Sequence, residues 1–231
     1  MSSQSTLLPD LVNFDRVGLR YGRGPEVLID ATLDLPQGSF TFLTGPSGAG
    51  KTSLLKLCYL SLKPSRGLIR MFGRDTSLMT NAEKQAIKRR IGVVLQDFHL
   101  VEHLSVYENV ALPLRVAGQT RSSYNRDLIE LLDWVGLGDR LQAYPPTLSG
   151  GEKQRAAIAR AVIAKPDLLI ADEPTGNVDP EIGRRLLRLF AEMNRMGTTI
   201  LIATHDTHLI NEIQARIIRI DNGNIYKGMP E

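Results

Sequence analysis

The chain has 231 residues, of which 42% are hydrophobic and 23% are charged, and its formal net charge is +3. This length and composition are typical of a globular domain with a sizeable core. The charge excess is too small to indicate nucleic-acid binding, so no nucleic-acid partner is expected. A single cysteine, Cys58, excludes an intrachain disulfide. Because no stretch approaches the ~18–20 apolar residues that cross a bilayer, and no signal peptide is recognisable, any membrane role is expected to be peripheral and through a partner.

Strand-like runs dominate the first part of the chain, after a polar tail that we expect at residues 1–12. Breakers such as Pro36 and Gly38 separate these runs, and Asn81 could cap a later helix. In chain order the predicted elements are strands 13–19, 31–35 and 40–44, a helix at about 51–62, a strand at 68–72, a helix at about 81–90 and a strand at 91–95. The early strands favour an antiparallel β flank.

The pattern changes in the middle of the chain, where Pro113 and Pro145 are among the breakers that bracket a helical region. Beyond it the predicted elements are a helix from about 153, a strand at 168–171, a helix around 182–193, strands at 199–203 and 216–220, and a short final strand. Strands that alternate with helices favour a mainly parallel α/β sheet. We therefore expect a core of residues 13–96 and 153–231, with residues 97–152 inserted as a helical subdomain.

A glycine-rich segment, Gly45–Thr52, fits the phosphate-binding pattern G-x-x-x-x-G-K-S/T. It follows a predicted strand and precedes a predicted helix, a context that a chance glycine-rich turn would lack. The glycines let the backbone aim N–H groups at phosphate oxygens, and the helix N-terminus adds partial positive charge. Lys51 would reach the β- and γ-phosphates of a nucleotide, and the Thr52 hydroxyl would ligate Mg²⁺. The expected nucleotide-binding residues here are Gly45, Pro46, Ser47, Gly48, Ala49, Gly50, Lys51, Thr52 and Ser53.

A second motif ends the predicted strand at 168–171 with two carboxylates, Asp172 and Glu173. Asp172 could hold Mg²⁺ opposite Thr52, and Glu173 could orient and deprotonate an attacking water. Solvated acids near a turn would give the same pattern in isolation. Together with the P-loop, however, the pair predicts the catalytic site of a nucleotide hydrolase.

Between these motifs lies Leu148-Ser149-Gly150-Gly151-Glu152, in which Ser149 can cap a helix and the glycines allow close approach to an anion. This order of motifs resembles that of the ATP-binding-cassette (ABC) ATPases, over essentially all of residues 13–228. The resemblance implies a P-loop NTPase fold with a RecA-like parallel-sheet core, an antiparallel β flank and a helical subdomain that carries the signature motif, Leu148–Glu152. Residues 13–231 would form a single ABC-type domain that uses ATP and Mg²⁺.

The resemblance also implies roles for single residues. Gln96 matches the glutamine that senses Mg²⁺ and the γ-phosphate, His205 the histidine that contacts the γ-phosphate, and Tyr21 the aromatic residue that stacks on adenine. Asp179 matches the D-loop, in which Val178 replaces the usual leucine. The nucleotide bound by the opposite protomer would contact Ser149, Gly150, Gly151 and Glu152. The implied catalytic residues are Lys51, Gln96, Glu173 and His205, and the implied Mg²⁺ ligands are Thr52, Gln96 and Asp172.

Three segments are similar to one branch of this family, which contains the FtsE cell-division ATPases, the LolD lipoprotein-release ATPases and the MacB-type exporters. They are Leu95–Leu100, Ser105–Leu114 and Ala171–Asn177, and Phe190–Asp206 is most similar to FtsE sequences. The tail before Phe14 is longer than is usual in that group. This likeness implies an ATP-hydrolysing subunit that forms a homodimer when ATP is bound.

The same likeness implies an FtsX-like integral membrane partner at the cytoplasmic face of the inner membrane, at the division septum, where the complex would activate cell-wall hydrolases. The alternative is the ATPase subunit of a lipoprotein-releasing or MacB-type export transporter, which would use the same chemistry with another partner. A DNA-repair or translation ATPase is disfavoured, because only about a hundred residues separate the P-loop from the signature, without coiled-coil heptads, and the chain carries one cassette.

Overall fold

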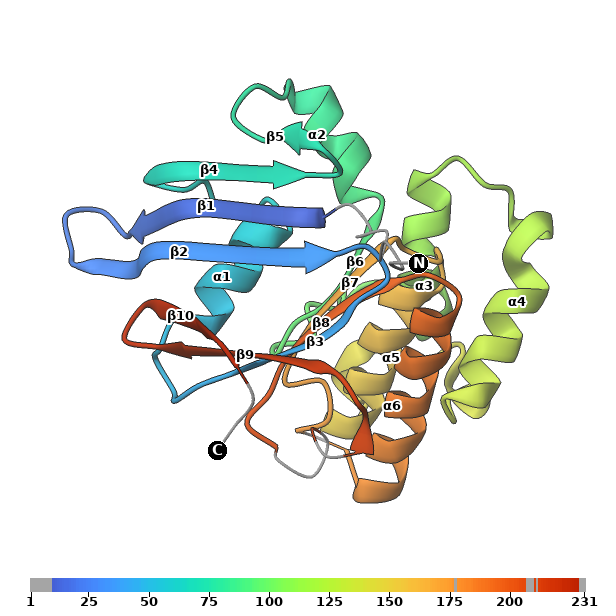
Figure 1. The fold of residues 1–231 in the computed structure, drawn as a ribbon. Helices are drawn as coiled ribbons and strands as arrows, with labels where there is room; N and C mark the ends of the chain where they lie inside the picture. Colours follow the sequence, from blue (N-terminus) through green and yellow to red (C-terminus); the bar gives the residue numbers. More distant parts are fainter. Residues whose placement is uncertain (1–9, 177, 207–209, 211, 229–231) are drawn as a thin grey trace, which may run out of the picture.

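The computed structural model describes residues 10–176, 178–206, 210 and 212–228. Most of the predicted tail (residues 1–9), and Asn177 of one predicted branch motif, lie outside this part of the chain. Strand β1 (Asp10–Arg20) begins within the segment predicted as a tail. Figure 1 shows a sheet with helices on both faces, a smaller sheet beside it and a group of helices at one side.

The central sheet has six strands in the order β10-β9-β3-β8-β7-β6, and all neighbours are parallel except β9 and β10. These strands are β3 (Phe40–Thr44), β6 (Ile91–Val94), β7 (Leu168–Asp172), β8 (Thr199–Ala203), β9 (Arg216–Asp221) and β10 (Asn224–Lys227). Strands β7 and β8 are buried along their whole length because helices cover both faces of the sheet, which explains their continuous apolar runs. The predicted parallel α/β core is confirmed.

The predicted antiparallel flank is a second sheet in the order β2-β1-β4-β5. Its further strands are β2 (Glu26–Pro36), β4 (Arg66–Met71) and β5 (Arg74–Asp75). Strand β2 begins at Glu26, whereas the sequence predicted a start at Ala31. Asp30 adopts a left-handed backbone with φ 45° and breaks the alternation of buried and exposed residues, which hid the first half of the strand from the sequence pattern. Helix α1 (Lys51–Cys58) contacts both β2 and β7 and so joins the two sheets.

The helical region contains α3 (Val106–Val116), α4 (Arg121–Trp134) and the start of α5 (Gly150–Val162), with short 3₁₀ turns at Gly138–Arg140 and Pro145–Thr147. Pro113 lies inside α3 and is not a boundary of the region. The helix continues beyond it, since the Ala117 N–H donates to the Pro113 carbonyl at 3.0 Å. Helix α5 is continuous and packs against both α3 and β6, so it connects the helical region to the central sheet.

Two further helices belong to the core, α2 (Asn81–Lys88) and α6 (Pro180–Arg195). The cap of α2 is Thr80 and not Asn81. The Thr80 side chain accepts the Glu83 N–H, and the Glu83 carboxylate accepts the Thr80 N–H. Phe190 and Leu186 of α6 are buried in the same hydrophobic cluster as Leu169 and Ala171 of β7, so α6 covers that face of the sheet.

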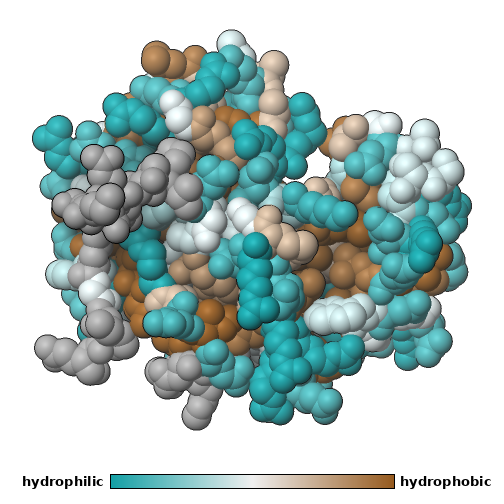
Figure 2. Space-filling view, turned by 45° about the vertical axis from the view of Figure 1, so that its right-hand side comes forward, coloured by the Kyte–Doolittle hydropathy of each residue, from teal (hydrophilic) through white to brown (hydrophobic). Residues whose placement is uncertain are grey.

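The face shown in Figure 2 carries mostly hydrophilic residues, with patches of hydrophobic residues among them. A cavity of about 530 Å³ is lined by apolar residues of α4, α5 and α6, among them Leu131, Val162, Leu189 and Met193. Within the part of the chain that the structure describes, no helix is long and apolar enough to cross a membrane.

Candidate functional site

The carboxyl ends of β3, β6, β7 and β8 meet at a cavity of about 580 Å³. This edge is where parallel α/β sheets bind ligands. The cavity brings together predicted site residues from four separate segments of the chain. Its lining residues are Val27, Gly45, Pro46, Ser47, Gly48, Gly50, Lys51, Thr52, Ser53, Gln96, Asp172, Glu173 and His205.

The loop between β3 and α1 needs glycine at two positions for steric reasons. Gly45 has φ 143°, and a Cβ there would lie 2.1 Å from the Ile220 carbonyl oxygen. Gly50, with φ 108°, stands at the N-cap position of α1. The Lys51 ammonium donates to the carbonyl oxygens of Gly45 at 2.8 Å and Pro46 at 3.1 Å, so it lies against the loop and beside the cavity. A cation and the N-terminus of α1 thus face the same space, which suits a phosphate chain.

Opposite this loop, the Thr52 hydroxyl donates to the Asp172 carboxylate at 2.7 Å. Burial raises the pKa of Asp172, and the Thr52 hydrogen bond works in the opposite direction. Among the described residues no group of three His, Cys, Asp or Glu side chains could hold a metal ion. The hydroxyl and the carboxylate nevertheless fit Mg²⁺, which binds proteins through one or two oxygen ligands and takes its others from phosphates and water.

Glu173 is held by three contacts at the mouth of the cavity. Its N–H donates to the Ala203 carbonyl at 2.9 Å, and the Thr204 hydroxyl donates to Oε2 at 3.2 Å. His205 Nδ1 lies 2.7 Å from Oε1, while the His205 side chain itself is exposed. The backbone of Glu173 has φ 49°, a left-handed conformation that costs a non-glycine residue about 1–2 kcal/mol. A strained residue fixed in this way at a cavity is typical of a functional site.

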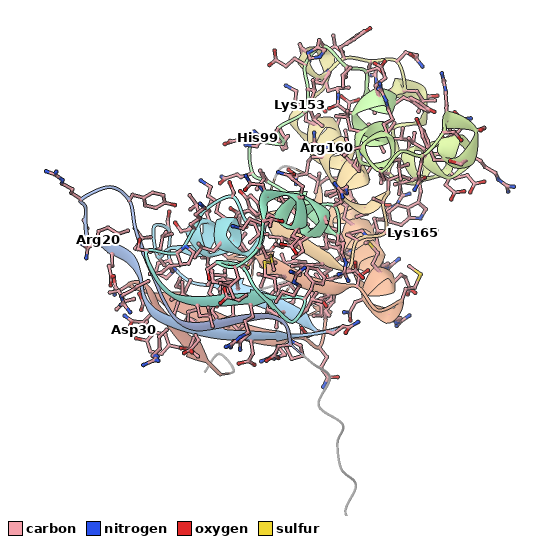
Figure 3. The ribbon with its side chains drawn as sticks, turned by 90° about the horizontal axis from the view of Figure 1, so that it is seen from above. Arg20, Asp30, His99, Lys153, Arg160 and Lys165 are labelled. Atoms are coloured by element: carbon pink, nitrogen blue, oxygen red, sulfur yellow. The ribbon has the colours of Figure 1, made fainter. Side chains whose placement is uncertain are left out.

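Gln96 lines the cavity at the end of β6, and the two residues after Asp97 connect its loop to α5. Phe98 and His99 both have positive φ, and their carbonyl oxygens accept hydrogen bonds from Arg160 at 2.8 and 2.7 Å. Figure 3 shows Arg160 and His99 on neighbouring segments. Burial lowers the pKa of Arg160. Helix α5 therefore holds the loop that carries Gln96.

Two predicted binding residues lie beside the cavity rather than in its lining. The Tyr21 hydroxyl is 3.0 Å from Ser53 Oγ, which connects the turn after β1 with α1, and the Tyr21 side chain is half exposed. Ala49 is buried within the loop.

The signature residues and Asp179 do not line the cavity. Ser149 caps α5, accepting the Glu152 N–H at 3.2 Å, and its own N–H donates to Glu152 Oε2 at 2.8 Å. Asp179 caps α6 by accepting the Ile182 N–H at 3.0 Å. A Cβ at Gly150 would meet nothing within 4 Å. The chain's own packing therefore does not require glycine at the start of α5.

Three residues that shape this region were not among the predicted site residues. Val27 lines the cavity, but a valine in a strand gives no sequence signal of such a role. Thr204 is fully buried and bonds Glu173, and its position directly after an apolar strand was a signal that could have found it. Arg160 acts at long range, 62 positions from Phe98, so no local pattern indicates it.

Known proteins are similar to this chain in both sequence and fold. A family model described as "ABC transporter" matches residues 28–176. The cell division ATP-binding protein FtsE of Escherichia coli K12 is 43% identical over 219 residues, which cover 95% of this chain and 99% of that protein. Its namesake in Bacillus subtilis is 38% identical over 217 residues, 94% of this chain and 95% of the other.

Solved structures of ATP-binding cassettes also match the fold of this chain. A dimeric ATP-binding cassette in a post-hydrolysis state, bound to ADP and Pi, matches with a TM-score of 0.86 and 30% identity, over 95% of this chain and all of that one. An ATP-binding subunit of an ABC transporter matches with a TM-score of 0.86 and 28% identity, over 95% of this chain and 90% of that one.

Proposed function

The chain belongs to the ABC transporter family and is an ABC-type ATPase, and from this premise we propose that it is an FtsE-like subunit that drives a step of bacterial cell division. The observation that carries the proposal is similarity to FtsE along nearly the full length of both chains. The residues gathered at the cavity support the ATPase chemistry.

ATP binds with its phosphates along the loop from Gly45 to Gly50, whose backbone and whose Lys51 ammonium neutralise their charge. Thr52, Asp172 and Gln96 would hold Mg²⁺, which would supply neutralisation of phosphate charge. The 2.7 Å hydrogen bond between Thr52 and Asp172 supports this choice, because it places two oxygen ligands side by side at the cavity.

Glu173 orients the attacking water and accepts its proton as the bond from water to the γ-phosphorus forms and the bond from that phosphorus to the β,γ-bridging oxygen breaks, so that ADP leaves with its electron pair. Thr204 and His205 fix the two carboxylate oxygens, which keeps Glu173 in place despite its strained backbone. With Nδ1 bonded to Glu173, His205 can use Nε2 to contact the γ-phosphate. Phosphoryl transfer of this kind depends on positioning and charge stabilisation, and these contacts supply both.

A second copy of the chain completes each site with Ser149, Gly150, Gly151 and Glu152, and with Asp179. The exposed, sterically unneeded Gly150 supports an outside ligand at this helix start. Dimeric cassettes among the solved structures support the same arrangement. Since closure depends on the γ-phosphate, hydrolysis opens the dimer and performs mechanical work.

This motion passes through the helical region, around residues 98–114, to an FtsX-like membrane protein. The subunit would lie peripherally on the cytoplasmic face of the inner membrane, at the division septum, where the complex activates cell-wall hydrolases.

The test is affinity capture of a Glu173→Gln variant from its native membrane with ATP present, followed by mass spectrometry. This variant keeps the binding residues and slows hydrolysis, so the complex accumulates. We expect an FtsX-like protein together with septal proteins. Capture of a lipoprotein-release or exporter permease instead would contradict the division role and assign the same ATPase to transport.

A further inference from the structure

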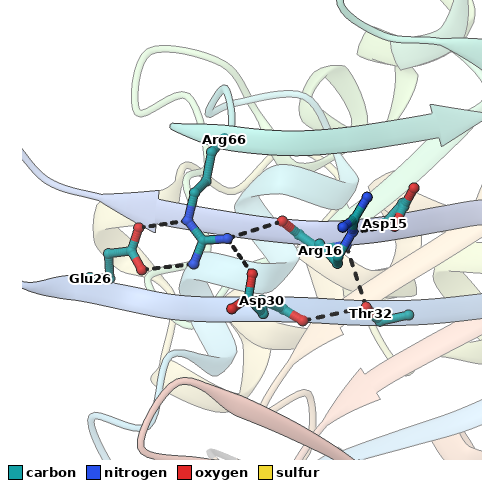
Figure 4. A network of polar contacts seen from close by, with 6 residues as sticks. All are labelled: Asp15, Arg16, Glu26, Asp30, Thr32 and Arg66. Carbon is teal, nitrogen blue, oxygen red and sulfur yellow. Dashed lines mark hydrogen bonds and ion pairs between the residues drawn. The ribbon is translucent and has the colours of Figure 1, made fainter.

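One guanidinium joins three strands of the antiparallel flank (Figure 4). Arg66, the first residue of β4, binds both oxygens of Glu26 on β2, with Nε–Oε1 and Nη2–Oε2 distances of 3.0 Å. Its Nη1 also donates to Asp30 Oδ1 and, at 3.5 Å, to the Arg16 carbonyl oxygen on β1. We call this cluster, Arg66 with Glu26, Asp30 and the Arg16 carbonyl, the Arg66 clamp.

The backbone is distorted where the Arg66 clamp binds it. Arg16 and Asp30 both have left-handed φ, 48° and 45°, and the pairing of β1 with β2 shifts register beside them. Gly67, next to Arg66, has φ 81°, and a Cβ there would lie 2.3 Å from the Arg16 carbonyl oxygen. These bulges turn the Arg16 carbonyl and the Asp30 carboxylate toward the guanidinium. Exposed ion pairs contribute little to stability. The stability that this pair adds is therefore too small to explain why two residues adopt a strained backbone around it.

The Arg66 clamp lies at the root of the turn that carries Tyr21. Glu26 is the residue with which the chain re-enters the sheet after that turn. On the other side of the turn, the Arg20 N–H donates to Ser65 Oγ at 2.9 Å, and the Ser65 N–H donates to the Gly18 carbonyl at 2.8 Å. Ser65 and Arg66 therefore fasten both ends of the turn to β4.

Inside the turn, the Tyr21 carbonyl accepts the Gly24 N–H at 3.1 Å. Tyr21 is 47% exposed, and its hydroxyl is hydrogen-bonded to Ser53 of α1. A shift of the turn would move the ring relative to the loop that binds phosphate.

We infer that Arg66 is a positioning residue for the nucleotide base: the clamp sets the distance between the Tyr21 ring and the P-loop and so tunes affinity for ATP. This inference rests on the proposed function, in which adenine stacks on Tyr21. The planar fork of arginine suits the task, because it binds Glu26 with two nitrogens while the third reaches Asp30. The Arg66 guanidinium holds the pKa of both carboxyls below the usual range, so the clamp stays charged at neutral pH.

The experiment compares ATP with inorganic tripolyphosphate, a ligand with phosphates and no base, by titration calorimetry. Tyr21→Ala is expected to weaken ATP binding about 10-fold and Arg66→Gln about 3- to 10-fold, while the affinity of both variants for tripolyphosphate stays within about 2-fold of the parent chain. In a Tyr21→Ala background, Arg66→Gln should cause no further loss. The matched control is Arg74→Gln, which breaks an exposed ion pair with Glu83 away from the turn and should leave both affinities unchanged.

Three outcomes would overturn the inference: equal losses of ATP and tripolyphosphate affinity in Arg66→Gln, no loss of ATP affinity, or an undiminished loss in the Tyr21→Ala background. If Tyr21→Ala leaves ATP affinity unchanged, the stacking role in the proposed function is wrong and the inference falls with it, which is a result distinct from a failure of Arg66. Should Arg66→Gln not fold, Glu26→Gln removes the bidentate partner and makes the same test.

Discussion

The two parts of the proposed nucleotide site differ in how far one chain completes them. At the cavity the key side chains already bond to each other, as Thr52 does to Asp172 and Glu173 to His205. At the start of α5 the bonds of Ser149 stay within its own cap, and Gly150 faces open space. Contacts within one chain therefore organise the phosphate half of the proposed site, whereas the signature half would be completed by the second chain that the proposal requires.

The largest effect is expected from a variant that disables the phosphate half of the site. Lys51→Ala should weaken ATP binding by on the order of 100-fold or more, because each hydrogen bond to a charged group is worth ~1.5–3 kcal/mol. Direct titration with ATP measures this loss. Lys56→Ala, on the same helix but outside the cavity lining, is the control and should bind normally. Unchanged affinity in Lys51→Ala would contradict the P-loop assignment.

The next variant keeps both halves and blocks the chemistry between them. Glu173→Gln should lower ATP turnover by ~10²–10⁴-fold, the usual contribution of a general base, with little loss of ATP binding. The variant should also accumulate as a dimer with ATP, which light scattering after size exclusion detects. Glu130→Gln, at an exposed ion pair on α4, should remain like the parent chain. A Glu173→Gln variant that stays monomeric at saturating ATP would rule out the two-chain site.

The third variant tests the signature half, and its control is a second serine that caps a helix in the same way. Ser105 begins α3 with the same reciprocal bonds that Ser149 makes at α5, but Ser105 is buried and Ser149 is exposed. Each change to alanine removes a cap worth about 0.5–2 kcal/mol. Ser149→Ala should in addition lower ATP turnover ~10-fold or more without changing the chain's own ATP affinity. Equal turnover in the two variants would mean that Ser149 is a helix cap and nothing more.

The smallest effect is expected from a variant outside both halves of the site, and it is an effect on stability alone. Hydrogen bonds from Arg74 and then Thr80 lower the pKa of Glu83 from 4.5 to about 2. Because folding lowers this pKa, the stabilisation is complete above pH 4.5 and is lost as the pH falls toward 2. Glu83→Gln should therefore lower the melting temperature at pH 7 by at most ~2–4 °C and have little effect near pH 2. A loss of equal size at both pH values would show that the Glu83 charge is not the cause.

Sequence patterns predicted the parts of this molecule that follow from local patterns or from the general geometry of a parallel sheet. Continuous apolar runs predicted β3, β7 and β8, because these strands are buried on both faces. The P-loop and the acidic pair were predicted to lie together, and Thr52 and Asp172 do so, since parallel strands bring their carboxyl ends to one edge. The roles of these residues in catalysis stay predictions.

Features that depend on distant contacts escaped prediction. The first half of β2 was missed because the bulge at Asp30 breaks the alternation of its side chains. Pro113 was taken as a boundary, although the neighbouring turns of α3 continue the helix around it. The Arg66 clamp and the bonds from Arg160 to the loop after Gln96 join residues far apart in the chain, so their partners could not be identified from sequence.

The left-handed backbone of Glu173 has a consequence for protein engineering. Glycine adopts φ 49° without the steric penalty that a side chain incurs. We expect a library selected for thermal tolerance alone to enrich glycine at this position and to discard the carboxylate. Any directed evolution of this enzyme toward heat resistance therefore needs a selection for turnover in every round, because one of the residues whose backbone glycine would relax is the proposed general base.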